Sequence, residues 1–296
     1  MNISSLGANG IFCAILIGLV SVRISKFAID HNWIIRMPDV VPEGILNSFN
    51  SIIPSGLNII IWYGLGIAIS YFTKGAMTLG TLVTTVIATP LSYLVSPLGM
   101  VVIIIVFCLS WFFGIHGGSV VFTAIMPLYI AAYATNAELA VAGKELVFNP
   151  IFLYGAVSIL GGSGNTLPLC VMGLKSKSKQ ISAVSKAALV PGLFNINEPA
   201  IFGFPIMYNP ILLIPFTLNS LVVMGFMYVA YKFGLMSLPQ VLIMTTLPVG
   251  IQSLMSTLDW RNVVFALLMF PVVYLIYLPF SKFMKNSVLQ KKQLRK

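Results

Sequence analysis

Charged side chains are rare in this chain. It has 17 basic and 7 acidic residues among 296, or 8%, whereas roughly a quarter of an ordinary soluble domain is charged. No Asp, Glu, Lys or Arg occurs between positions 75 and 137, and hydrophobic residues make up 58% of the whole. A water-soluble fold of this size needs a polar surface, so a soluble enzyme is excluded. The length allows about seven to ten membrane-embedded segments, and we expect an all-α polytopic membrane protein.

Cysteine is also scarce, and no motif for a metal or a cofactor is present. Cys13, Cys108 and Cys170 are scattered, without the close Cys or His spacing of a metal site or a disulfide framework. The GGSGN run at 161–165 lacks the Lys-Ser/Thr that a phosphate-binding P-loop needs, and it fits a turn between membrane segments better. We therefore expect neither a metal nor a cofactor.

Basic residues outnumber acidic ones, for a formal net charge of +10, but they do not share one face. Six of the 17 fall between 282 and 296, and four lysines fall between 175 and 186. Clusters of this kind beside apolar spans are typical of cytoplasmic loops, so nucleic-acid binding is not predicted. The pattern predicts that 23–50, 175–187 and the C-terminus, with a basic tail at 286–296, lie in the cytoplasm of a cell-membrane protein.

Apolar runs alternate with interrupted ones. A polar stretch at 135–149 predicts a loop outside the membrane, and continuous spans are expected at 9–28, 52–72 and 261–281. The stretch 188–219 is apolar yet contains five prolines and four asparagines, which a plain spanning helix would not tolerate. It predicts broken helices or a re-entrant hairpin around a protein-enclosed cavity, and 238–256 repeats the pattern more weakly.

Two ionisable residues lie within the apolar regions and are the main functional candidates. Glu198 is the only acid between Glu145 and Asp259, and His116 is surrounded by glycines in the uncharged stretch. An ionisable group at membrane depth usually faces a site or a cavity. Together they suit a ligand rich in hydroxyls. They could also form a proton pair, or the carboxylate could hold a substrate hydroxyl for group transfer.

Several motifs resemble one family. The segment GLFNINEPAIFGFPIMYNPILLIPF at 192–216 resembles the signature of the enzyme IIC permeases of the bacterial phosphotransferase system, in the lactose/cellobiose/diacetylchitobiose group. Other segments follow in the family's order, and the resemblance covers essentially the whole chain: RMPDVVPEGILNSFNSIIP at 36–54, GIHGG at 114–118, GGSGNTLPL at 161–169 and STLDWRN at 256–262.

The resemblance implies a fold and a function. It implies an enzyme IIC-like transporter with two re-entrant hairpins, in which 1–95 is the remnant of a dimerisation domain and 96–285 is the transport domain. The cargo would be a sugar, with a β-linked disaccharide such as cellobiose expected. His116 and Glu198 match the family's sugar-binding pair near the hydroxyl that receives phosphate, and Asn195 and Asn197 share the loop. Enzyme IIB would donate the phosphoryl group and would itself receive it from enzyme IIA.

Two departures from the family pattern are visible. Family members have several more spans ahead of the position of Met1, so we expect a shortened front, poor dimerisation and weak transport. Met244 stands where the family usually has a tryptophan. A proton-coupled secondary sugar transporter and an inactive remnant remain the alternatives.

Overall fold

Helices and loops make up the part of the chain that the computed structural model describes. That part comprises residues 11–36, 38, 43–83, 85–86, 94–204 and 206–293, with side chains from Cys13 to Phe280. No strand occurs in these ranges, so the expected all-α class is confirmed. They include four helices long and apolar enough to span a membrane, at 43–72, 118–141, 210–232 and 261–280. The start of the span expected at 9–28 and the side chains of the basic tail lie outside the described residues.

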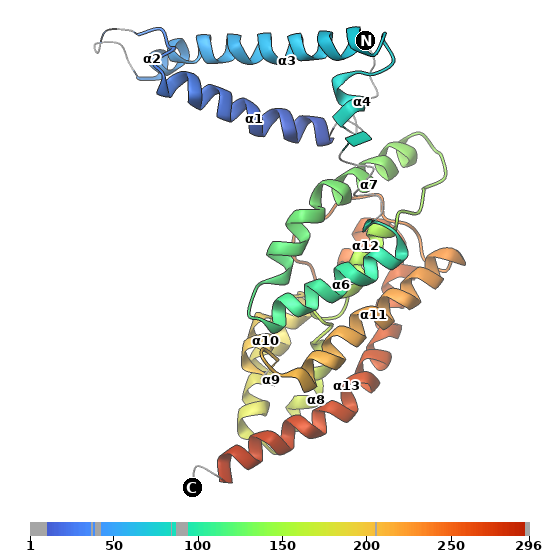
Figure 1. The fold of residues 1–296 in the computed structure, drawn as a ribbon. Helices are drawn as coiled ribbons and strands as arrows, with labels where there is room; N and C mark the ends of the chain where they lie inside the picture. Colours follow the sequence, from blue (N-terminus) through green and yellow to red (C-terminus); the bar gives the residue numbers. More distant parts are fainter. Residues whose placement is uncertain are drawn as a thin grey trace. The chain divides into compact units, whose positions relative to one another are not determined.

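The chain divides into two compact units, residues 1–92 and 93–296. The first contains α1 (Ile11–Asp30), α2 (Glu43–Asn50), α3 (Ile52–Phe72) and α4 (Leu79–Val83). Polar contacts join α1 to α3: Trp62 Nε1 donates to Ser21 Oγ at 2.8 Å, and Asn58 Nδ2 donates to Ser25 Oγ at 3.0 Å. The later α3 residue meets the earlier α1 residue, so the two helices are antiparallel (Figure 1).

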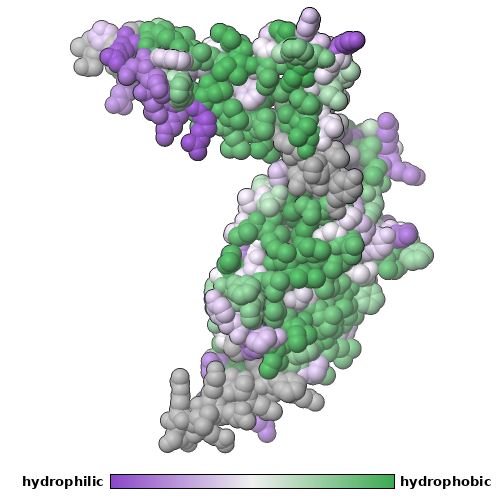
Figure 2. Space-filling view, viewed as in Figure 1, coloured by the Kyte–Doolittle hydropathy of each residue, from purple (hydrophilic) through white to green (hydrophobic). Residues whose placement is uncertain are grey.

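Both units expose much hydrophobic surface. On α3, Ile60, Tyr63 and Phe72 are more than two thirds exposed. Green apolar side chains cover most of the visible surface of each unit in Figure 2. A water-exposed protein rarely shows such broad apolar faces, whereas lipid covers them at no cost, so these faces fit a membrane-embedded fold.

The second unit carries the interrupted helices. In chain order its elements are α6 (Pro97–Phe112), the π-helical turn η4 (Gly118–Phe122), α7 (Thr123–Val141), the 3-10 helix η5 (Pro150–Val157), α8 (Leu167–Leu174), α9 (Lys179–Leu193), α10 (Glu198–Gly203), α11 (Pro210–Lys232), α12 (Ile251–Thr257) and α13 (Arg261–Gln293). Helices α6, η5, α11 and α13 pack around one core. Trp111, Phe107, Phe216 and Tyr277 are its largest fully buried side chains.

The residues that look like helix breakers in the sequence start helices in the structure. Proline follows a capping residue at the start of α6, η5 and α11, where its fixed φ suits the first turn and its missing N–H costs nothing. The cap side chain accepts a backbone N–H in each case, as Asn149 Oδ1 does from Ile151 at 3.0 Å and Asn209 Oδ1 does from Ile211 at 3.1 Å. The expected broken helices are therefore present. These three helices begin with a side-chain cap, whereas α8, α10 and α12 begin without one.

One expected boundary is wrong. The loop expected at 135–149 starts later, because α7 continues to Val141. Asn136 is 1% exposed, and both ends of its amide have partners: Nδ2 donates to Pro239 O at 2.9 Å and Oδ1 accepts from Val147 N at 3.0 Å. A buried asparagine with both partners is stable inside a helix, so the polar composition did not mark a helix end.

Asp259, Arg261 and Ser237 form a hydrogen-bonded cluster, called here the polar clasp, in the connection between α11 and α13. Asp259 Oδ2 accepts from Arg261 Nη2 at 2.6 Å and from Ser237 Oγ at 2.5 Å, and Arg261 Nη1 donates to Gly234 O at 3.0 Å. The Arg261 guanidinium and the Ser237 hydroxyl hold the pKa of the Asp259 carboxyl well below its usual range. Next to them, Asn262 donates to Ser237 O and accepts from Ser237 N. The clasp fixes one end of the segment that leads to α12.

We expect Asp259→Asn to lower the unfolding temperature of the detergent-solubilised chain at neutral pH. A carboxyl whose pKa is depressed by folding stabilises the fold above its unfolded pKa, about 3.9, and loses this effect as pH falls through the folded value. The difference between wild type and variant should be constant from pH 7 to about pH 4.5 and shrink below that. Thermal unfolding across pH measures it, with exposed Glu145→Gln as the control; equal differences at pH 7 and pH 3 would contradict the assignment.

Candidate functional site

Asn195 joins three separate segments at the centre of the second unit. It follows α9 with φ +60°, a left-handed conformation that asparagine tolerates. Its Oδ1 accepts from Gly161 N at 2.9 Å and Gly162 N at 3.3 Å, and its Nδ2 donates to Leu247 O at 3.3 Å. The 194–198 turn is thereby attached both to the GGSGN loop and to the segment that precedes α12.

Asn197 makes a second attachment to the same loop. Its Nδ2 donates to Ser163 O at 2.5 Å and to Thr166 Oγ1 at 3.2 Å, and the residue is 3% exposed. The loop allows this approach because Gly162 has φ +78° and no side chain; a Cβ there would lie 2.6 Å from Asn197 Cγ. The glycine-rich run therefore works as a tight turn around two asparagine side chains.

His116 and Glu198, far apart in sequence, meet in space. His116 Nε2 lies 3.5 Å from Glu198 Oε1, and the two side chains are 47% and 43% exposed. The Ser119 N–H donates to His116 Nδ1 at 3.0 Å, so in the neutral ring the proton is on Nε2 and faces the carboxylate. The Trp111 ring packs on the imidazole with 4.5 Å between centroids. Ser119 and Trp111 thus fix the orientation of the imidazole, and close to half of each side chain of the pair remains exposed.

A cavity of about 580 Å³ lies beside this pair. His116 and Asn195 line it, whereas Glu198 is outside the lining and reaches it through its contact with His116, 3.5 Å from Nε2. Its polar lining comes from uncharged groups: Ser119, Thr123, Ser158, Ser163, Thr245, Thr246, Gln252, Ser253, Ser256, Thr257 and Asn262. Apart from His116 and the tyrosines, no ionisable residue lines it among the residues that the structure describes. Such a lining suits a neutral ligand with many hydroxyls, and the volume is in the range of ligand pockets.

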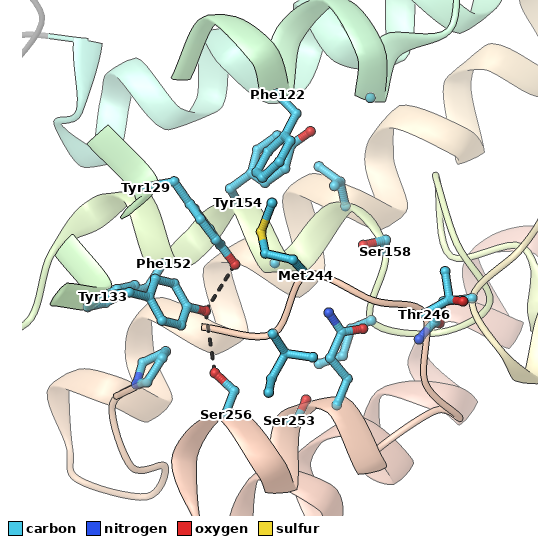
Figure 3. A pocket seen from close by; sticks show the side chains of 18 of the residues that line it. Phe122, Tyr129, Tyr133, Phe152, Tyr154, Ser158, Met244, Thr246, Ser253 and Ser256 are labelled. Atoms are coloured by element: carbon cyan, nitrogen blue, oxygen red, sulfur yellow. Dashed lines mark hydrogen bonds between the residues drawn. The ribbon is translucent and has the colours of Figure 1, made fainter. Parts of the chain in front are cut away.

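Aromatic rings form one wall of the cavity (Figure 3). Phe122 and Tyr154 stack with 5.6 Å between centroids and an interplanar angle of 22°. The Tyr129 and Tyr133 hydroxyls are 2.9 Å apart, and Ser256 Oγ lies 3.5 Å from the Tyr133 hydroxyl. Flat rings beside hydroxyl groups provide both an apolar face and hydrogen-bonding tips for a ligand.

The structure places the four predicted site residues in two groups. His116 and Glu198 come together with both side chains partly exposed, although Glu198 Oε2 itself is buried and has no partner among the described residues. The amide nitrogens of Asn195 and Asn197 instead hold loops. The sequence interpretation missed the aromatic wall and Ser256. The spacing of Tyr129 and Tyr133, one helical turn apart, was an available signal, but 11 tyrosines and 20 phenylalanines in an apolar chain made it weak. In the described part of the chain, no three His, Cys, Asp or Glu side chains gather as a metal-ligand set.

Interrupted apolar helices around a hydroxyl-lined cavity, with His116 in its lining and Glu198 beside His116, define a multi-pass membrane protein with an interior cavity. Residues 1–220 match the family described as "Phosphotransferase system, EIIC". That match covers most of the chain, which therefore belongs to the EIIC family of the phosphotransferase system.

Curated relatives and a solved structure agree with this assignment. The chain is 31% identical to the oligo-beta-mannoside-specific EIIC component of Bacillus subtilis strain 168, over 98% of the chain and 66% of that protein. It is 36% identical to the lichenan permease IIC component of the same strain, over 80% of the chain and 53% of that protein. The chain thus spans about half to two thirds of the length of these relatives.

The fold agrees with a transporter solved by crystallography. The crystal structure of ChbC, the IIC component from the N,N'-diacetylchitobiose-specific phosphotransferase system, superposes with a TM-score of 0.87 at 29% identity. The match covers 99% of this chain and 68% of ChbC. The enzyme IIC-like transporter fold expected from the sequence is confirmed.

Proposed function

We propose that this chain is the sugar-specific permease component of a phosphotransferase system and that the cavity of the second unit holds the sugar. The observation that carries the proposal is the uncharged, hydroxyl-rich and aromatic lining with the His116–Glu198 pair at its edge. Sugars offer hydroxyls that donate and accept and apolar ring faces that pack on aromatic rings, and this lining is complementary to both.

A β-linked disaccharide such as cellobiose is the proposed substrate. The cavity volume of about 580 Å³ leaves room for two sugar rings. The relatives support a substrate of this class without agreeing on one sugar, since their names specify oligo-beta-mannosides, lichenan, lactose and N,N'-diacetylchitobiose.

His116 and Glu198 are proposed to act on the hydroxyl that receives phosphate. The Glu198 carboxylate would accept the hydroxyl proton while the sugar oxygen attacks phosphorus, so that one P–O bond forms and the P–S bond to the cysteine of enzyme IIB breaks. Nε2–H of His116, oriented by Ser119 and Trp111, would donate to the sugar or to the carboxylate. Asn195 and Asn197, expected from the resemblance to bind substrate, are proposed to hold the turn that presents Glu198.

Roles for the other parts of the chain are proposed from the distribution of charge and from the family. Residues 1–95 are proposed to contribute to a dimer interface, and 96–285 to carry the sugar. Lys175, Lys177, Lys179 and Lys186 are all exposed, and no described acid forms an ion pair with any of them. This lysine surface is proposed to face the cytoplasm and to contact enzyme IIB, which receives its phosphoryl group from enzyme IIA.

Uptake of radiolabelled cellobiose tests the function directly. Membrane vesicles carrying the chain are supplied with phosphorylated or unphosphorylated enzyme IIB on the cytoplasmic side, and the internal sugar is analysed. Sugar phosphate that appears only with phosphorylated enzyme IIB is the expected result. Accumulation of unmodified sugar that follows a proton gradient would instead support a proton-coupled transporter using the same pair.

The proposed topology makes a separate prediction. Single cysteines at Ser48 and Gln180, both exposed, should react only with thiol reagents that reach the cytoplasm. Ser178 is the poorer position because it is buried and its Oγ caps α9. These variants are made in a chain from which the native Cys13, Cys108 and Cys170 have been removed. A cysteine at exposed Val141, the last residue of α7, serves as the comparison position for labelling. Reaction of Ser48→Cys or Gln180→Cys with an impermeant reagent outside intact cells would contradict this orientation.

A further inference from the structure

Four aromatic side chains of the cavity lining follow one another in contact, and we call them the aromatic wall: Phe122, Tyr129, Tyr133 and Tyr154. The first three lie seven and four residues apart along the continuous helical run of η4 and α7, a spacing that places them on one face. Ring centroids are 5.3 Å apart for Phe122 and Tyr129 and 4.7 Å apart for Tyr129 and Tyr133. Tyr154 of η5 packs against Phe122 and Tyr129, so the rings form one continuous surface (Figure 3).

This surface extends beyond the reach of one sugar ring at the His116–Glu198 pair. From Gly118, which begins η4 beside His116, to Tyr129 the chain rises roughly 16 Å at the 1.5 Å per residue of a helix. Helical side chains lean toward the N-terminus, which shortens this gap without closing it. A ring that places a hydroxyl beside the pair therefore leaves the wall free for a second ring linked to the first.

The Tyr154 hydroxyl is available to a ligand. Tyr154 is 8% exposed, lines the cavity, and makes no hydrogen bond through its hydroxyl with any residue that the structure describes. Buried tyrosine hydroxyls generally have a partner, because an unpaired one loses its bond to water without replacement. A hydroxyl-bearing ligand in the cavity would supply that partner.

The Tyr129 hydroxyl can either donate to a ligand or accept from it. Ser256 Oγ has its shorter contact with Val241 O, at 3.0 Å, so its proton points there and its oxygen remains an acceptor 3.5 Å from the Tyr133 hydroxyl. If Tyr133 donates to Ser256, Tyr129 donates to Tyr133 at 2.9 Å and offers lone pairs to the cavity. If Tyr133 instead donates to Tyr129, the Tyr129 proton is free for the cavity.

We propose that the aromatic wall is the subsite for the second ring of the sugar, the ring that is not phosphorylated. This rests on the function proposed above and assigns the other half of the substrate. Apolar faces of that ring pack on the wall, its hydroxyls pair with Tyr129 and Tyr154, and Tyr133 orients the Tyr129 hydroxyl. The wall thereby selects sugars of at least two rings, while His116 and Glu198 act on the first ring.

The binding of two-ring and one-ring sugars tests this subsite. The full chain in lipid nanodiscs is titrated by calorimetry with cellobiose and lactose and with the one-ring methyl β-glucoside and methyl β-galactoside. Tyr129→Phe and Tyr154→Phe each remove one hydroxyl and keep the ring, so each should lower disaccharide affinity about tenfold, the effect of one lost hydrogen bond. Affinity for the one-ring sugars should not change. Tyr274→Phe, in α13 and outside the cavity lining, is the matched control.

The kinetics of phosphorylation distinguish a lost contact to the second ring from general damage to the site. With phosphorylated enzyme IIB, the KM for the disaccharide should rise about tenfold in Tyr129→Phe while kcat stays at the wild-type value, because the chemistry takes place on the other ring. A fall in kcat with unchanged KM, or an equal loss of one-ring and two-ring binding, would overturn the subsite. If the one-ring sugars bind too weakly to titrate, KM and kcat for the disaccharide decide.

The outcomes separate this proposal from the proposed function. A disaccharide that binds the wild type, Tyr129→Phe and Tyr154→Phe with equal affinity would overturn the subsite and leave the sugar permease intact. Failure of all four sugars to bind the wild type would overturn both proposals. Weaker disaccharide binding in the two variants, with wild-type binding in Tyr274→Phe, supports both.

Tyr133 is proposed as a positioning residue that acts through Tyr129. Tyr133→Phe removes the partner that lies 2.9 Å from the Tyr129 hydroxyl, so it should weaken disaccharide binding, but less than Tyr129→Phe does. The double variant, Tyr129→Phe with Tyr133→Phe, should bind the disaccharide no more weakly than Tyr129→Phe alone, because both changes remove the same contact. Additive losses would show that Tyr133 acts independently of Tyr129 and would overturn this positioning role.

Discussion

Glu198→Gln is expected to lower the formation of sugar phosphate at least about 100-fold, the lower range of general acid–base effects. The carboxylate lies 3.5 Å from Nε2 of His116, and its Oε2 has no protein partner among the described residues. Glutamine keeps the size of the side chain and one acceptor oxygen, but it does not take up the hydroxyl proton. Product formation with phosphorylated enzyme IIB and labelled cellobiose measures the effect.

The control for this variant is Glu145→Gln, which neutralises an exposed acid in the loop after α7, away from the cavity lining. Both variants should insert into the membrane at wild-type levels and elute as single species in detergent. Sugar phosphate made by Glu198→Gln at the wild-type rate would remove this residue from the proposed chemistry.

Gly162→Ala is expected to destabilise the second unit by about 2–4 kcal/mol, from left-handed backbone strain and overpacking together. Residue 162 has φ +78°, and an added Cβ would lie 2.6 Å from Asn197 Cγ and 2.8 Å from Asn195 O. Neither asparagine can move away from an added Cβ without breaking its own hydrogen bonds. Sugar binding should fall as well, because the same contacts position the turn that carries Glu198.

The matched control is Gly225→Ala, within α11, where an added Cβ meets no atom within 4 Å. Helix propensity alone makes that substitution neutral or slightly stabilising. Thermal unfolding in detergent compares the two variants. Equal melting temperatures for wild type and Gly162→Ala would show that the GGSGN turn is not the tight junction described above.

The sequence predicted the parts of this fold that follow from local chemistry. Scarce charge and dense proline predicted a membrane protein with interrupted helices, and isolation in apolar sequence singled out His116 and Glu198. It did not predict the end of α7, because the partner of Asn136 is Pro239, which is distant in the chain. The aromatic wall of the cavity was also missed. Aromatic residues are common throughout the chain, so the sequence does not show which of their rings face the cavity.

The bonds of Asn195 have a mechanical consequence. The Asn195 side chain bonds Gly161 and Gly162 of the GGSGN turn and Leu247 in the segment before α12, and its own backbone lies in the turn that carries Glu198. Any rearrangement that preserves these three bonds moves the proposed reactive carboxylate, the GGSGN turn and the segment before α12 together. A sugar held by these joined segments would keep the same hydroxyl beside Glu198 throughout such a movement, so its orientation for phosphorylation would already be set when it first bound.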